Sequence, residues 1–128
     1  MEPAFLKLGE ILLIHKDQLE RYGGIPGIRD IGLLQSAAAM PRAGLADRYL
    51  HEDVFEMAAA YMYHIVRDHP FVDGNKRTGA VAALVFLAMS DVEIAVDEDE
   101  LENVVRSVAG GTTTKSEIAD LFRGNATP

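Results

Sequence analysis

NKRTGAVAALVFLAMS, residues 75–90, is the most informative segment of the sequence for the architecture. From position 80 to position 89 it carries only apolar residues, and it contains no proline, so it predicts a helix. A helix that is apolar on every side is normally buried in the middle of its domain. We therefore expect one central buried helix at about 75–90, with the rest of the chain packed around it.

Helical spacing of apolar residues recurs in the segments on both sides of this stretch. Several of them begin after an aspartate that can cap a helix, and others end at a glycine pair or before a proline. The expected helices are residues 4–21, 31–38, 53–66, 97–109 and 115–122. Residues 42–51 are polar and irregular, and the alternating residues 91–96 predict either a short strand or a crossing segment. The fold class is therefore all-α: a compact bundle of about five or six helices with at most a marginal short strand.

Composition sets the class of protein. The chain has 128 residues, so we expect residues 1–128 to form a single domain. Its formal net charge of −8 disfavours direct nucleic-acid binding, because proteins that bind nucleic acid present a basic face. It has no cysteine, which excludes disulfide scaffolds and thiolate zinc sites. No apolar run approaches the roughly 18 residues of a membrane helix and no signal peptide is evident, so we expect a cytoplasmic protein.

The segment HPFVDG, residues 69–74, places polar and ionisable groups between two hydrophobic helices, directly before the central helix. A helix N-terminus presents free N–H groups and a partial positive charge, which together attract anions. Gly74 lets the backbone approach a phosphate closely, since it has no Cβ. Lys76 and Arg77 oppose the helix dipole in the first turn, an arrangement that a bound anion would stabilise. The segment therefore predicts a phosphate-binding site.

Two further residues suggest chemistry at this site. Asp73 offers a hard oxygen ligand for Mg²⁺ shared with phosphate. Histidine titrates near neutral pH, so His69 could accept a proton from a hydroxyl. Together these groups indicate transfer of a phosphorus-containing group to a hydroxyl. The alternative is an ordinary turn made of proline and glycine, and the other histidines, His15, His51 and His64, are expected to be surface or core side chains.

The segment 69–78, HPFVDGNKRT, resembles the signature of the Fic/Doc superfamily, in particular its death-on-curing (Doc) toxin branch. A second block, RYGGIPGIRD at residues 21–30, is similar to a stretch of the same branch. The resemblance implies a Fic/Doc-like domain in which His69 deprotonates the target hydroxyl and Asp73 holds Mg²⁺. It also implies a set of residues that bind the nucleotide: Arg67, Gly74, Asn75, Lys76 and Arg77.

The resemblance also bears on the reaction. AMP-transferring members of the superfamily usually have glycine where this chain has Lys76, and arginine where it has Ala80, and the Doc branch shares both differences. It implies a toxin of a toxin–antitoxin pair: an ATP- and Mg²⁺-dependent kinase that phosphorylates a threonine of elongation factor Tu, blocks translation and is countered by a Phd-type antitoxin. Two alternatives stay open. One is an AMP transferase, favoured by Pro70 and Gly74, and the other is a non-enzymatic scaffold that binds a partner through an apolar groove.

Overall fold

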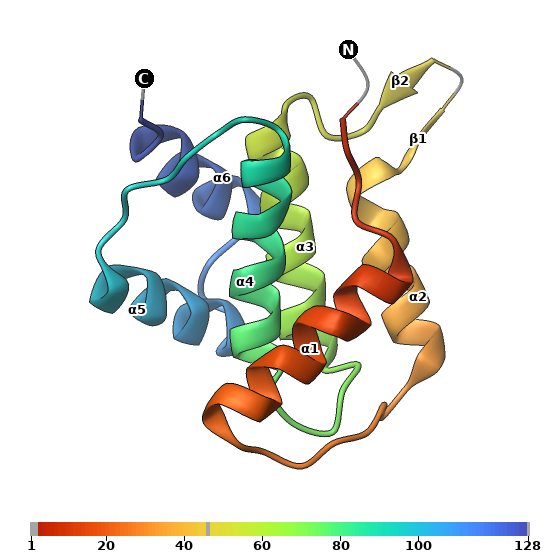
Figure 1. Ribbon diagram of the computed structural model, residues 1–128. Coiled ribbons are helices and arrows are strands. Elements are labelled where there is room, and N and C mark those ends of the chain that lie inside the picture. Colours follow the sequence, from red (N-terminus) through yellow and green to blue (C-terminus); the bar gives the residue numbers. More distant parts are fainter. Residues whose placement is uncertain (1–2, 46, 128) are drawn as a thin grey trace.

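The structure is a computed structural model that describes residues 3–45 and 47–127. Within these residues the chain forms six α-helices, one short 3-10 helix at Met40–Arg42 and one two-stranded hairpin, so the all-α prediction is confirmed (Figure 1). The helices are α1 (Leu8–Tyr22), α2 (Ile31–Ala39), α3 (Val54–Asp68), α4 (Asn75–Met89), α5 (Glu98–Ala109) and α6 (Lys115–Gly124), and the strands are β1 (Gly44–Leu45) and β2 (Arg48–Tyr49).

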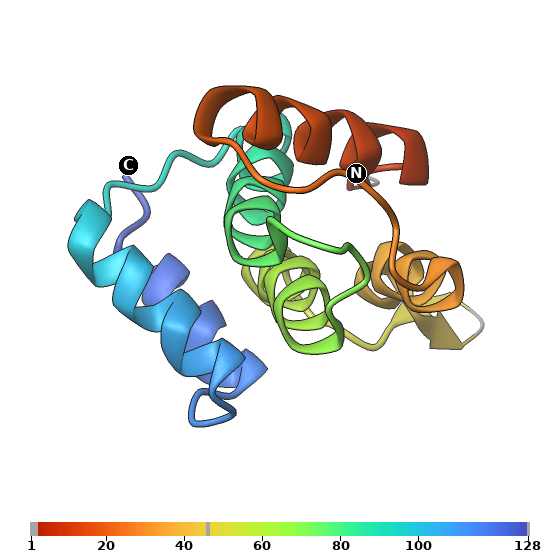
Figure 2. The ribbon, with the colours of Figure 1, turned by 90° about the horizontal axis from the view of Figure 1, so that it is seen from below.

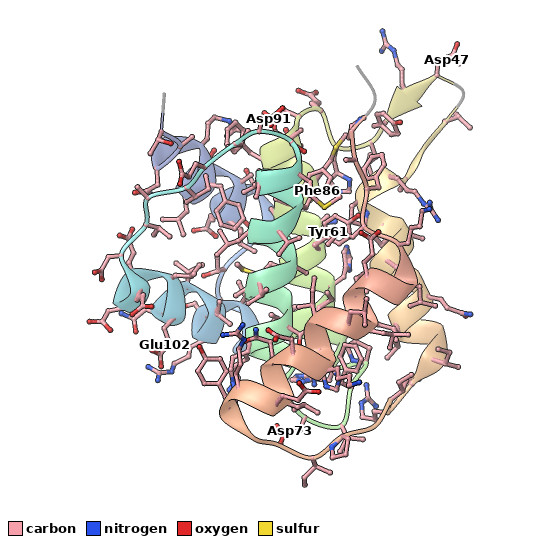
Figure 3. The ribbon with its side chains drawn as sticks, in the orientation of Figure 1. Asp47, Tyr61, Asp73, Phe86, Asp91 and Glu102 are labelled. Carbon is pink, nitrogen blue, oxygen red and sulfur yellow. The ribbon has the colours of Figure 1, made fainter. Side chains whose placement is uncertain are left out.

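Helices α3 and α4 lie side by side at the centre of the molecule, and the other helices surround them (Figures 1 and 2). Helix α1 crosses α4, helix α2 packs on α3 from one side, and α5 and α6 cover the other side. Tyr61 of α3 and Phe86 of α4 pack at the middle of this arrangement with ring centroids 5.3 Å apart (Figure 3). The core is thus a helix-on-helix core, as expected when most segments are amphipathic.

The predicted central helix is present, but it shares the centre with α3. Residues of α4 such as Ala83 and Phe86 are fully buried, whereas Met89 in its last turn is 43% exposed. Helix α3 is buried along most of its length, because α2, α4, α5 and α6 all contact it. The apolar run therefore predicted a central helix correctly, but the final turn of α4 reaches the surface.

Helix starts follow the predicted caps, with one exception. The Asp30 and Asp53 carboxylates accept hydrogen bonds from the first turns of α2 and α3, as expected for capping residues. The first helix, predicted from residue 4, begins instead at Leu8. The preceding segment is extended because the buried hydroxyl of Tyr61 accepts a 2.8 Å hydrogen bond from the Leu6 N–H.

Of the two alternatives predicted for residues 91–96, the crossing segment is the one found. Residues 91–96 form a crossing segment whose only pairing among the described residues is an isolated bridge between Ile94 and Ala126. The hairpin lies instead within residues 42–51, which we predicted to be irregular, with Gly44 opposite Tyr49. Strands this short carry too few residues for a two-residue period to be recognisable, so the pattern missed them.

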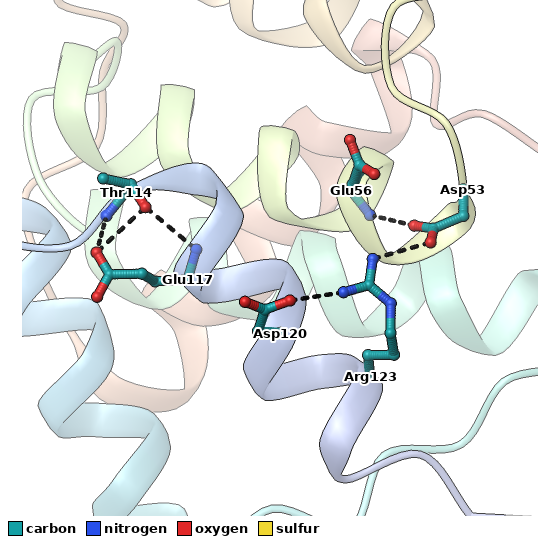
Figure 4. A network of polar contacts seen from close by, with 6 residues as sticks. All are labelled: Asp53, Glu56, Thr114, Glu117, Asp120 and Arg123. Carbon is teal, nitrogen blue, oxygen red and sulfur yellow. Dashed lines mark hydrogen bonds and ion pairs between the residues drawn. The ribbon is translucent and has the colours of Figure 1, made fainter.

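A polar network fastens α6 to the start of α3 (Figure 4). Arg123 donates to the carboxylates of Asp53 and Asp120, and Thr114 forms a capping box with Glu117 at the first turn of α6.

Across the described part of the chain, none of the helices has the length and apolarity needed to cross a bilayer.

Candidate active site

The segment 69–74 forms the connection between α3 and α4 and is built around two left-handed residues. His69 follows α3 with φ 49° and ψ 57°, and Gly74 precedes α4 with φ 79°. Histidine adopts this conformation only uncommonly, whereas glycine adopts it freely. Phe71, midway along the connection, is 1% exposed and anchors the loop in the core.

Asn75 and His15 hold the loop from inside. The Asn75 side-chain amide accepts from the Phe71 N–H and donates to the Phe71 carbonyl, both at 3.0 Å. His15 of α1 stacks on the Phe71 ring with centroids 3.7 Å apart and ring planes 6° apart. Its Nε2 lies 2.8 Å from the Asp73 carbonyl oxygen, which can only accept, so Nε2 carries the proton in this contact. Both buried polar side chains therefore fix the backbone of the loop.

The connection between α1 and α2 holds the loop from outside. It runs antiparallel to residues 70–73: the Arg29 N–H donates to the Pro70 carbonyl, and the Val72 N–H donates to the Gly27 carbonyl. Further along, the Ile25 N–H donates to the Asp73 carboxylate at 3.0 Å. The two sequence blocks singled out above are thus paired in space.

A cleft of about 310 Å³ opens at this loop and brings together six of the seven predicted site residues. It is lined by His69, Val72, Asp73, Gly74, Asn75, Lys76 and Arg77. No acceptor among the described residues is found for the backbone N–H groups of residues 75–77, as is usual at a helix start. The cleft therefore combines free N–H groups, two cations, one carboxylate and an imidazole.

Arg67 is the predicted site residue that the structure places elsewhere. Its guanidinium donates to the carbonyl of Ala109 at 3.0 Å and lies against Gly111, at the end of α5. It does not line the cleft, because its position in the last turn of α3 directs it toward α5. Asn75 lines the cleft, and because its side-chain oxygen and nitrogen both bind the Phe71 backbone, its backbone N–H is the group that faces a ligand.

Asp73 is held as a carboxylate. Hydrogen bonds from the N–H groups of Ile25 and Gly74 lower the pKa of Asp73, and the positive charge of Arg77 lowers it further. The described residues contain no group of three or more His, Cys, Asp or Glu side chains able to enclose a metal ion. A single carboxylate fits Mg²⁺, which usually takes one or two protein ligands and completes its shell with phosphate and water.

A second groove of about 560 Å³ lies between α1, α4 and α5 and shares Lys76 and Arg77 with the cleft. Its floor includes the half-buried Val81 and the buried Val105, and its rim carries carboxylates of α5. The Arg77 guanidinium lies 5.2 Å from the centroid of the Tyr22 ring, at the boundary between the two hollows. Anything seated in this groove would contact the same two cations as a ligand in the cleft.

Three groups that shape the site were missed from the sequence: the His15 ring, the Ile25 N–H and the Arg29 side chain. His15 was expected to be a surface or core side chain, and it is indeed buried, but its contact with Asp73 joins positions far apart in the chain. The only signal that could have found the other two was the resemblance of residues 21–30, which carried no role for single residues.

Comparison with known proteins gives consistent matches over most of the chain. The family model described as Fic/DOC family matches residues 5–87. The chain is 34% identical over 114 residues to a protein named "Protein kinase doc" from Escherichia phage P1, covering 89% of each chain. It is 38% identical over 107 residues to "Toxin Doc" of Mycolicibacterium smegmatis, covering 82% of each.

Proposed function

The chain belongs to the Fic/DOC family, and we propose that it is the toxin of a toxin–antitoxin pair that acts as a protein kinase. The observation that carries the proposal is the cleft in which His69, Asp73 and the start of α4 meet. In this proposal ATP is the phosphate donor and a threonine of elongation factor Tu is the acceptor, so that the toxin blocks translation. The name of the phage relative supports a kinase, and the names of both relatives support the toxin.

The phosphate groups of ATP bind at the start of α4. The N–H groups of residues 75–77 and the cations of Lys76 and Arg77 point to an anion there, and Gly74 supplies the left-handed backbone from which α4 starts at the cleft. Asp73 would hold Mg²⁺, which when bound neutralises charge on the phosphate oxygens. The low pKa of Asp73 keeps this carboxylate ionised and ready for the cation.

His69 accepts the proton of the acceptor threonine. As the hydroxyl oxygen forms its bond to the γ-phosphorus, its proton passes to an imidazole nitrogen of His69, and the bond from the γ-phosphorus to the bridging oxygen breaks to release ADP. The left-handed backbone of His69 places this residue on the cleft wall beside Asp73. The products are phosphothreonine and ADP, and the proton later leaves His69 for water.

A Phd-type antitoxin is the proposed partner, and we place it in the groove between α1, α4 and α5. Its apolar floor suits one face of an amphipathic helix, a common way for a folding segment to bind a groove. Because Lys76 and Arg77 line both the groove and the cleft, an occupied groove would compete for the groups that bind phosphate.

The main alternative is AMP transfer, favoured by Pro70 and Gly74, and a further alternative is a scaffold without activity. The intact mass of elongation factor Tu, incubated with the protein, ATP and Mg²⁺, separates them. A gain of one phosphate supports the kinase, a gain of one AMP supports the alternative, and an unchanged mass contradicts both for this target. Calorimetry of ATP binding to the Asp73→Asn variant adds a check on the metal role: unchanged Mg²⁺ dependence would refute it.

A further inference from the structure

Arg29 forms hydrogen bonds to the end of α3 and the loop that follows it, with both its side chain and its main chain. Its Nε donates to the His69 carbonyl at 2.5 Å, and its terminal nitrogen donates to the Asp68 carbonyl at 2.7 Å. Its own backbone N–H donates to the Pro70 carbonyl at 2.7 Å. One residue from the connection between α1 and α2 therefore satisfies three consecutive carbonyls, and the middle one belongs to His69.

These carbonyls sit where a helix end needs partners. The last carbonyls of a helix find no N–H donor within the helix, and the helix dipole makes this end negative. A guanidinium offers two donors in one plane together with a positive charge, so it matches two neighbouring carbonyls better than a lysine would. Without the guanidinium, the last turn of α3 could unwind, or His69 could adopt the right-handed helical conformation and extend the helix.

His69 is the residue that would change its conformation. It is one of only two non-glycine residues with positive φ in the described part of the chain, and this conformation persists only where the surroundings enforce it. On the other side of His69, Pro70 is buried and its carbonyl is held by the N–H groups of Arg29 and Asp30. No side-chain hydrogen bond of the His69 ring is found among the described residues, and the backbone conformation of His69 decides in which direction its Cα–Cβ bond leaves the loop.

We propose that Arg29 is a positioning residue, which holds the backbone of His69 in the left-handed conformation and thereby aims the imidazole at the acceptor hydroxyl. This inference rests on the proposed role of His69. It assigns to the block at residues 21–30 a function in the reaction, in addition to its packing. Arg29 itself does not line the cleft, and its Nε and one terminal nitrogen bind the carbonyls of His69 and Asp68.

The test compares Arg29→Met with Arg29→Lys and with a control, Arg21→Met. Arg21 is exposed on α1, and its hydrogen bonds go to Asp17 one helical turn away. We expect kcat for phosphate transfer to fall about 10- to 100-fold in Arg29→Met, as is typical when a reacting group is misplaced, while KM for ATP stays unchanged. Arg29→Lys should lie between this variant and the wild type, and Arg21→Met should match the wild type.

A second readout keeps this inference separate from the proposed function. The ¹³Cα and ¹³Cβ chemical shifts of His69 report its backbone conformation whether or not the protein transfers phosphate. We expect the left-handed shifts in the wild type and in Arg21→Met, and their loss in Arg29→Met samples that a melting curve shows to be folded. If Arg29→Met keeps both the His69 shifts and the wild-type kcat, the inference is wrong. If the wild type transfers nothing, the proposed function fails and the shifts still decide the role of Arg29.

Discussion

At the scale of single residues, the site is a loop in which most backbone N–H and C=O groups have a hydrogen-bond partner. The amide of Asn75 and the ring of His15 hold its inner side, and Arg29 and Ile25 hold its outer side. Such a loop is organised before any ligand binds, which is what electrostatic stabilisation of a transferred phosphate requires. The groups left facing the cleft are those with a proposed role in the reaction.

His15 allows the stabilising contacts of this loop to be separated. In His15→Phe the ring can still stack on Phe71, but the donor to the Asp73 carbonyl is lost. We expect the free energy of unfolding, measured by urea denaturation, to fall by about 1 kcal/mol, the usual net value of one hydrogen bond. His15→Gln keeps a donor near the same place and serves as the matched variant. An unchanged free energy in His15→Phe would show that the hydrogen bond adds nothing.

At the scale of helices, α3 carries the site at its C-terminus and is fastened at its N-terminus. The Asp53 carboxylate accepts from the Glu56 N–H at 2.9 Å and pairs with Arg123 of α6 at 2.9 Å (Figure 4). Burial opposes ionisation, but these two contacts outweigh it and lower the pKa of Asp53. The Asp53 side chain thus both caps α3 and links it to α6.

Asp53→Ala should therefore cost more than the loss of a surface ion pair. We expect its free energy of unfolding to fall by about 1–2 kcal/mol, the range for an N-cap replaced by alanine. Asp120→Ala is the control, because it removes only the exposed partner of the same Arg123 and should cost at most about 0.5 kcal/mol. Equal losses in urea denaturation of the two variants would contradict a capping role for Asp53.

The contact of α3 with α6 also predicts a dependence of stability on pH. Burial lowers the pKa of His64, and the Lys115 ammonium, 3.2 Å from its Nε2, lowers it further; together they outweigh the Asp68 carboxylate, 3.6 Å from Nδ1, which raises it. The folded chain then binds this proton less readily than the unfolded chain, so protonation favours unfolding. The contribution is complete above the ordinary pKa of 6.5 and is lost as the pH falls from there through the lowered folded-state pKa.

Urea denaturation between about pH 7.5 and pH 5 measures this effect. We expect the wild type to lose stability toward the acid side and His64→Gln to lose less over the same interval. A remaining slope is expected, because burial and then Lys115 lower the pKa of His51 as well. If His64→Gln shows the full slope of the wild type, the titration of His64 does not control the acid response.

At the scale of the whole molecule, the sequence predicted what depends on local pattern. Helix α4 was evident from its apolar run, and the caps Asp30 and Asp53 marked the starts of α2 and α3 correctly. The first helix was placed too early because a distant hydroxyl, that of Tyr61, holds Leu6 in an extended segment. Local periodicity contains no information on such a contact.

In the site, too, the features set by neighbouring residues were predicted and those set by distant contacts were not. Six of the seven predicted residues line one cleft because they lie within nine positions of each other, at a single loop and helix start. Arg67 was assigned from the family resemblance, but a helical position two residues before the loop directs it to the carbonyl of Ala109. His15 and Arg29 act across separations of 58 and 40 residues, which only the folded chain brings together.

Phosphate transfer at His69 is tested with ATP labelled at the γ or the α phosphate. The wild type and His69→Ala are incubated in parallel with elongation factor Tu and Mg²⁺, and the label bound to protein is measured. We expect γ-label on elongation factor Tu with the wild type, no α-label, and neither label with His69→Ala. Protein-bound α-label, or γ-label that persists in His69→Ala, would show that His69 does not transfer the γ-phosphate.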